Sequence, residues 1–126
     1  MKTETIAIGP IWRVIAVCDG QGRCPTLEAI STSPLGEKML RLMEKATTVG
    51  PANLIAERES KDLGDSLYEF RRRPRSGAHF RVIWFYDKGQ VVVCTHAFTK
   101  ARRKTPPNEI EKAQKVRERY LRERAS

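Results

Sequence analysis

The second half of the chain changes from helical to strand-like hydrophobic spacing, and this change limits the fold more than any other feature. Three segments, residues 66–72, 79–86 and 90–99, are rich in aromatic and β-branched residues. The last two are separated by Asp-Lys-Gly at residues 87–89, a composition typical of a β-hairpin. A further β-branched segment covers residues 12–18. The pattern predicts a small, strongly twisted antiparallel sheet of about four strands.

Helical spacing occurs before and after these strands. Apolar residues at positions 35, 39, 42, 43 and 46 form one face of a helix that ends near Gly50 and Pro51. Residues 25–30 indicate a short helix before it. A final helix begins at Thr105 and carries an apolar stripe from Ile110 to Tyr120. The predicted order β-α-α-β-β-β-α indicates an α+β fold, with N-terminal helices packed on the sheet, a C-terminal helix, and the helices on one face.

The length of 126 residues predicts a single domain over residues 1–126. The longest apolar runs are about five residues, whereas a transmembrane helix needs about 20. Three cysteines are an odd number for a disulfide framework, and no export signal is evident, so we expect a cytoplasmic protein that does not bind membranes. No His-Glu-x-x-His pattern or Cys/His spacing is present, and we expect neither a metal nor a cofactor.

Positive charge is concentrated in the second half. The formal net charge is +9, and residues 71–126 contain 16 of the 24 basic residues but only 5 of the 15 acidic ones. Such a field attracts polyanions, and it favours a nucleic acid or the ribosome as a partner. A basic surface that serves only solubility, or one that meets an acidic protein, is the alternative.

Strand alternation sorts the candidate site residues. His79 and Arg81 fall on one face of the third strand, and Phe80, Val82 and Trp84 fall on the other. If the aromatic row faces the core, His79 and Arg81 face outward into a groove. The basic residues expected to edge this groove, which suits the phosphates of a nucleic acid, are Arg71, Arg72, Arg73, Arg75, Lys100, Arg102, Arg103 and Lys104.

The same alternation places His96 on the face of Val92, Cys94 and Phe98 in the fourth strand. A lone histidine on a strand is also well explained as a structural residue, and both readings of His79 and His96 stay open. Phe98 could stack a base or line the core.

An ordered set of segments resembles one known group of proteins. Residues 67–71 (Leu-Tyr-Glu-Phe-Arg) are followed by Phe-Arg-Val-Ile-Trp-Phe-Tyr at 80–86, by Val-Val-Val-Cys-Thr-His-Ala-Phe-Thr-Lys at 91–100, and by Lys-Thr-Pro at 104–106. Together with the early Trp-Arg-Val at 12–14, this order resembles the phage-derived HigB-like branch of the RelE/ParE superfamily of type II toxins.

The resemblance implies a toxin encoded beside a helix-turn-helix antitoxin, monomeric when alone or part of a larger assembly with the antitoxin. RelE- and HigB-like members cut mRNA on the ribosome without metal, by attack of the ribose 2′-hydroxyl on the adjacent phosphate. ParE-like members instead inhibit DNA gyrase without catalysis. The first activity is our expectation; a gyrase inhibitor and an inactive phage relic are the alternatives.

The resemblance also implies catalytic residues. Arg81 matches the family's strand arginine at the scissile phosphate, and Arg71 matches a basic residue on the preceding strand. His96 matches a histidine common in this branch, and Lys100 matches a basic position after the fourth strand. RNA binding is then assigned to the remaining cations Arg72, Arg73, Arg75, His79, Arg102, Arg103 and Lys104. The chain departs from the pattern at Ala97, where the branch usually has glycine, and at Ala101, where a second lysine is usual.

Overall fold

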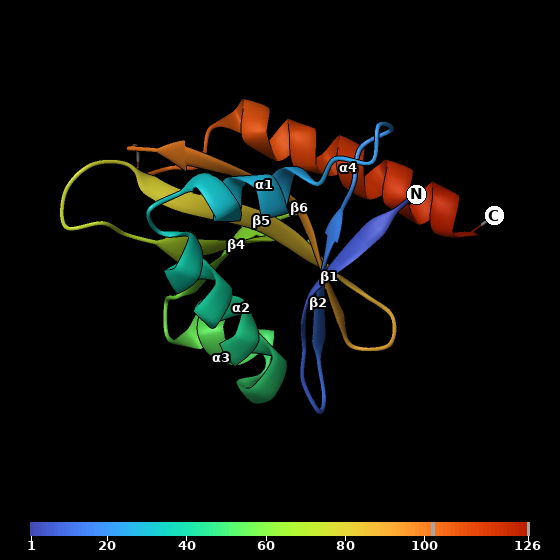
Figure 1. The fold of residues 1–126 in the computed structure, drawn as a ribbon, viewed down its shortest axis with the longest axis horizontal. Helices are drawn as coiled ribbons and strands as arrows, with labels where there is room; N and C mark the ends of the chain where they lie inside the picture. Colours follow the sequence, from blue (N-terminus) through green and yellow to red (C-terminus); the bar gives the residue numbers. More distant parts are fainter. Residues whose placement is uncertain (102, 126) are drawn as a thin grey trace.

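The computed structural model describes residues 1–101 and 103–125 (Figure 1). The predicted RNA-binding residue Arg102 lies outside these described residues. The elements are β1 (Thr3–Ile8), β2 (Arg13–Val17), α1 (Pro25–Thr32), α2 (Gly36–Val49), α3 (Pro51–Ala56), β3 (Ser60–Gly64), β4 (Leu67–Arg72), β5 (His79–Asp87), β6 (Val91–Lys100) and α4 (Pro107–Ala125).

The described residues form an α+β fold around one sheet, in the order β1-β2-β6-β5-β4-β3. The prediction of about four antiparallel strands is wrong in two respects. The sheet has six strands, because β1 and β3 add an edge strand on each side, and it is mixed, because β2 pairs with β6 in parallel. The predicted hairpin is confirmed, since β5 and β6 pair antiparallel across residues 87–91.

Helices cover both faces of the sheet rather than one. Met39, Leu42 and Met43 of α2 pack with Phe80, Trp84 and their neighbours on the first face. The stripe of α4 packs against Ile83, Phe85 and Val93 on the second face. Figure 1 shows α4 along one side of the sheet, with α2 and α3 on the other. Because helices cover both faces of the sheet, β5 lies in the middle of three layers, and its side chains are apolar on both faces.

A β-bulge in β6 changes which residues share a face. Trp84 pairs with Cys94, but Ile83 pairs with His96, so Thr95 is the extra residue. The Thr95 hydroxyl donates to the carbonyl of Ile83 across the bulge, at 3.2 Å. His96 therefore lies on the face covered by α4, opposite to Val92 and Cys94. The predicted alternation across β6 is wrong for this reason.

No helix in the described ranges is both long enough and apolar enough to cross a membrane.

Candidate active site

A buried carboxylate organises the basic residues at one end of the α4-covered face. Glu69 of β4 is fully buried. One of its oxygens, Oε1, lies 2.6 Å from Nε of Arg71 and 3.8 Å from Nη1 of Arg81. The other oxygen accepts a hydrogen bond from the Thr105 hydroxyl at 2.6 Å. Glu69 thus holds two arginines and the segment before α4 together.

Arg81 is buried rather than open to solvent. Its side chain is 0% exposed, so the expectation that it faces outward into a groove is wrong. Nη2 of Arg81 lies 3.5 Å from the carbonyl oxygen of Arg103, which precedes α4. Burial lowers the pKa of Arg81, and the charge of Glu69 opposes this effect. An arginine nevertheless keeps its charge in a protein.

His79 lies at the rim of the same cluster and is only half-buried. Its register partners place it beside Lys100 of β6, two residues before Arg81 on β5. Burial lowers the pKa of His79, and the positive charges of Arg73, Arg81 and Arg71 lower it further. A neutral imidazole at the edge of a cationic cluster can accept a proton.

His96 is buried, with both ring nitrogens engaged. Nδ1 lies 3.0 Å from the Thr95 hydroxyl, and Nε2 lies 3.1 Å from a carboxylate oxygen of Glu109 in α4. Burial lowers the pKa of His96, although the contact with Glu109 opposes the shift. In the neutral tautomer with its proton on Nε2, His96 donates to Glu109, and the single proton of the Thr95 hydroxyl is shared between Nδ1 and the carbonyl of Ile83. His96 therefore connects the bulge of β6 to the first turn of α4.

These shifts predict a pH dependence of stability. The pKa of His96 and that of His79 are both lowered in the folded protein, so each favours folding above its unfolded pKa of about 6.5 and loses this contribution as the pH falls. The free energy of unfolding should therefore decline from pH 7 to pH 5.5. Chemical denaturation across this range should show a smaller decline for His96→Asn than for the natural chain.

His79→Asn is the matched control, because the chain has only these two histidines. It should change the pH dependence less, since His79 is the less buried of the two. Equal slopes for His96→Asn and the natural chain would contradict a neutral, buried His96.

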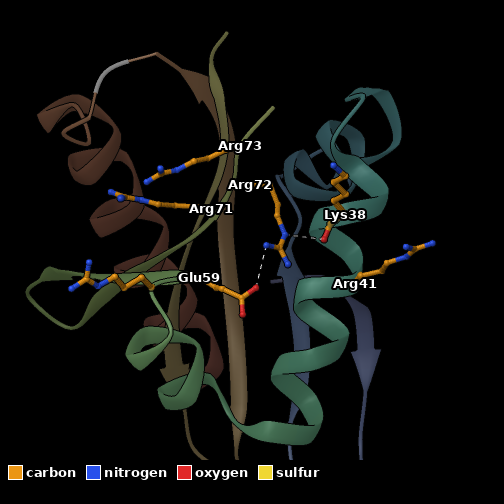
Figure 2. A pocket seen from close by; sticks show the side chains of 7 residues that line it. Lys38, Arg41, Glu59, Arg71, Arg72 and Arg73 are labelled. Atoms are coloured by element: carbon orange, nitrogen blue, oxygen red, sulfur yellow. Dashed lines mark hydrogen bonds and ion pairs between the residues drawn. The ribbon is translucent and has the colours of Figure 1, made fainter. Parts of the chain in front are cut away.

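The other predicted site residues separate into two sets. Arg73, Arg75, Lys100, Arg103 and Lys104 are exposed, and Arg73, Lys100 and Arg103 lie near His79 or Arg81. Arg72 instead belongs to the opposite face of β4: its Nε donates to the carbonyl oxygen of Lys38 at 3.2 Å, and Nη1 lies 3.2 Å from Glu59. Figure 2 shows Arg72 turned toward α2, whereas Arg71 and Arg73 point the other way.

Glu69, Thr105 and Glu109 belong to the site, although no sequence pattern indicates a functional role for them. The alternation does place Glu69 on the face of Arg71, which was the available signal. The contacts of Thr105 and Glu109 depend on how α4 returns over the sheet, and no local pattern shows that. In the described residues no group of three or more His, Cys, Asp or Glu side chains is arranged to hold a metal ion.

A comparison with protein families decides the relationship. Residues 25–118 match the family described as phage derived protein Gp49-like (DUF891). The chain belongs to this family. The Gp49-like family is part of the RelE/ParE-like toxin group, so that level of the predicted resemblance is confirmed. No curated protein matches the chain.

The Gp49-like match includes the whole candidate site. It extends from α1 into α4 and so contains Glu69, Arg71, Arg81, His96 and Glu109. The β1–β2 hairpin precedes the matched region. A phage-derived family of this group is consistent with a toxin of a toxin–antitoxin system.

Proposed function

We propose that the protein is the toxin of a type II toxin–antitoxin pair, of the HigB-like branch, and that it cuts mRNA on the ribosome without a metal ion. The observation that carries the proposal is the Glu69–Arg71–Arg81 cluster with His79 at its rim. Two permanent cations side by side, Arg71 partly exposed and Arg81 buried, suit a phosphate that gains negative charge in its transition state. Membership of the Gp49-like family supports the same assignment.

The reaction uses the RNA's own nucleophile. The 2′-hydroxyl oxygen forms a bond to the adjacent phosphorus, the bond from phosphorus to the 5′-oxygen breaks, and a 2′,3′-cyclic phosphate remains. Arg81 and Arg71 stabilise the charge on the non-bridging oxygens. His79 takes the proton of the 2′-hydroxyl, and Lys100, its register neighbour, donates a proton to the departing 5′-oxygen.

The geometry supports a different role for His96 than the resemblance implies. Both of its ring nitrogens are already engaged, and its side chain is 1% exposed. His96 is therefore proposed as a positioning residue, which holds α4 through Glu109. His79 has the accessible imidazole and takes the proton-transfer role.

One observation favours a non-catalytic alternative. Arg81 is fully covered, so a phosphate reaches it only if the segment before α4 moves. A ParE-like protein that inhibits gyrase by binding needs no such movement. A cognate helix-turn-helix antitoxin is a proposed partner under either reading.

The test is expression of the protein alone in a bacterial host, followed by mapping of mRNA 5′ ends before growth stops. New 5′ ends inside translated frames, with falling protein synthesis, would support the nuclease. Growth arrest with intact mRNA and a DNA-damage response would instead support gyrase as the target.

The proposed reaction predicts how cleavage depends on metal ions. The purified protein should still cut mRNA in a translation reaction that contains no divalent ion other than those the ribosome needs. Because a ribosome requires Mg²⁺, the informative comparison is Mg²⁺ alone against Mg²⁺ with added Mn²⁺ or Zn²⁺. Equal cleavage rates within about twofold are expected; strong activation by one transition metal would contradict a reaction carried by Arg, His and Lys side chains.

A further inference from the structure

A second cationic pocket lies at the other side of β4, between that strand and α2. Its volume is about 420 Å³. Pockets of about 300–1,000 Å³ are typical of small-ligand sites. The cations that line it are Lys38, Arg41, Arg58, Arg71, Arg72 and Arg73 (Figure 2). Glu59 is the one carboxylate in the lining.

The pocket exists because β3 stops short of the end of β4. The pairing of β3 with β4 ends at Ser60 and Phe70, and the amide of Arg71 makes one more hydrogen bond, to the carbonyl of Glu59 at 3.2 Å. Arg72 and Arg73 extend past this point along the sheet edge. α2 approaches them from the other side, where Lys38 accepts the hydrogen bond from Arg72.

Glu59 does not neutralise the pocket. Its carboxylate lies 2.8 Å from Nζ of Lys45 and 3.2 Å from Nη1 of Arg72, and the contact with Lys45 lowers the pKa of Glu59. Arg41 forms a pair with Glu37 at 2.7 Å, but both side chains are more than 70% exposed, so water weakens the attraction. Because Arg72 is paired with Glu59 and Arg71 with Glu69, the remaining positive charge of the pocket comes mainly from Lys38, Arg41, Arg58 and Arg73.

Arg58 occupies a backbone position that usually favours glycine. Its φ is +63°, in the left-handed region. The amide of Arg58 donates to Ile55 and that of Glu59 to Leu54, which is the Schellman arrangement at the end of α3. Glycine fits this position without strain, so an arginine here costs stability, and Arg58 is an exposed member of the pocket lining.

We propose that this pocket binds a backbone phosphate of the RNA chain, separate from the phosphate at Arg81. Arg71 and Arg73 connect the two places: both line the pocket, but their side chains point away from α2 (Figure 2), and their charges act on His79 and Arg81. An RNA chain with one phosphate in the pocket and another at Arg81 crosses β4 where β3 has ended. This second contact with RNA rests on the proposed nuclease function.

A charge-reversal pair tests the proposal. The double variant Lys38→Glu/Arg41→Glu should weaken binding of a short single-stranded 2′-O-methyl RNA by about tenfold, and lower the slope of log affinity against log salt by about 1, since each phosphate contact on a single strand contributes about 0.7. Fluorescence anisotropy of the full chain at several salt concentrations measures both. The 2′-O-methyl RNA has no free nucleophile, so binding is scored without cleavage.

Lys88→Glu/Lys115→Glu is the matched control. It makes the same change in net charge, and Lys115, like Arg41, forms an exposed pair with a glutamate four residues away. Its affinity should stay within about threefold of the natural chain, because general attraction by net charge is weaker than a direct contact. An equal loss of RNA affinity in both double variants would contradict phosphate binding in the pocket.

Arg58→Gly separates binding from folding. Glycine relieves the left-handed strain, so the melting temperature should stay the same or rise, while RNA affinity falls by about threefold or more. A merely structural Arg58 would leave the affinity unchanged, and this result would overturn its role.

The remaining outcomes are decisive as well. The proposal is wrong if the natural chain binds no RNA. It is also wrong if RNA binding is unchanged in Lys38→Glu/Arg41→Glu while binding of an oligoglutamate peptide is lost, because the pocket would then fit an acidic protein partner. If RNA binding depends on the pocket but no cleavage is found in any setting, the pocket stands and the nuclease assignment fails.

Discussion

Arg81→Lys is expected to lower the rate of mRNA cleavage by about 10²–10³-fold, the usual loss when one preorganised donor to a developing anion is removed. Lysine keeps a positive charge beside Glu69 but cannot offer the planar fork of two N–H groups that a guanidinium presents to phosphate oxygens. The measurement is the rate at which a defined mRNA is cut in a reconstituted translation reaction. Growth of a host that expresses the variant should recover in parallel.

Lysine is the right first substitution because Arg81 is buried against Glu69. Alanine would leave that carboxylate with less positive charge around it, so a loss of activity could reflect a loss of folding. Arg23→Lys, in the exposed loop after β2, is the matched control and should cut mRNA at the natural rate. Full activity of Arg81→Lys in a folded protein would show that Arg81 does not contact the reacting phosphate.

The central strands were predictable from sequence because their signals are local. β5 and β6 combine β-branched and aromatic residues with a turn at 87–89, and each feature is complete within a few residues. The edge strand β3, Ser-Lys-Asp-Leu-Gly, has no such signal. It is extended because the edge of β4 supplies hydrogen-bond partners, and a tertiary partner of this kind is not visible in a short window.

The environment of the site was harder to predict than its members. Arg71, Arg81 and His79 do come together, but Arg81 was placed in the open because a polar residue in an apolar strand ordinarily faces water. The run Val82–Tyr86, apolar at successive positions, was the sign that β5 is covered on both faces. The bulge at Thr95 has no sequence signal that we can identify, yet it alone moves His96 onto the face of Arg81.

The second pocket shows the same limit. Lys38 and Arg41 lie on the exposed face of α2, in the half of the chain without excess positive charge. Only the approach of α2 to the edge of β4 places them in one pocket with Arg72 and Arg73. The excess of basic residues after position 70 therefore indicates the β4 side of this pocket but not the α2 side.

Glu69→Ala is expected to lower the free energy of unfolding by about 3–5 kcal/mol, the usual effect of removing one partner from a buried ion pair. The carboxylate is fully buried, and it contacts Arg71, Arg81 and Thr105 at once. Arg71 can turn toward solvent when Glu69 is lost, since it is only partly covered, but Arg81 cannot. Urea denaturation followed by tryptophan fluorescence measures the change.

The double variant Glu69→Leu/Arg81→Met decides whether the loss comes from the uncompensated guanidinium or from the carboxylate's other bonds. Replacing both members of a buried pair by apolar groups is often neutral or stabilising, so the double variant should be more stable than Glu69→Ala if the buried charge dominates. It should also be inactive, because no phosphate ligand remains at position 81. If the double variant is instead as unstable as Glu69→Ala, the hydrogen bond to Thr105 carries the stability, and the main task of Glu69 is to hold the start of α4 over the site rather than to balance Arg81. A loss below about 1 kcal/mol in Glu69→Ala would contradict both readings, because a buried carboxylate with three partners cannot be removed at so small a cost.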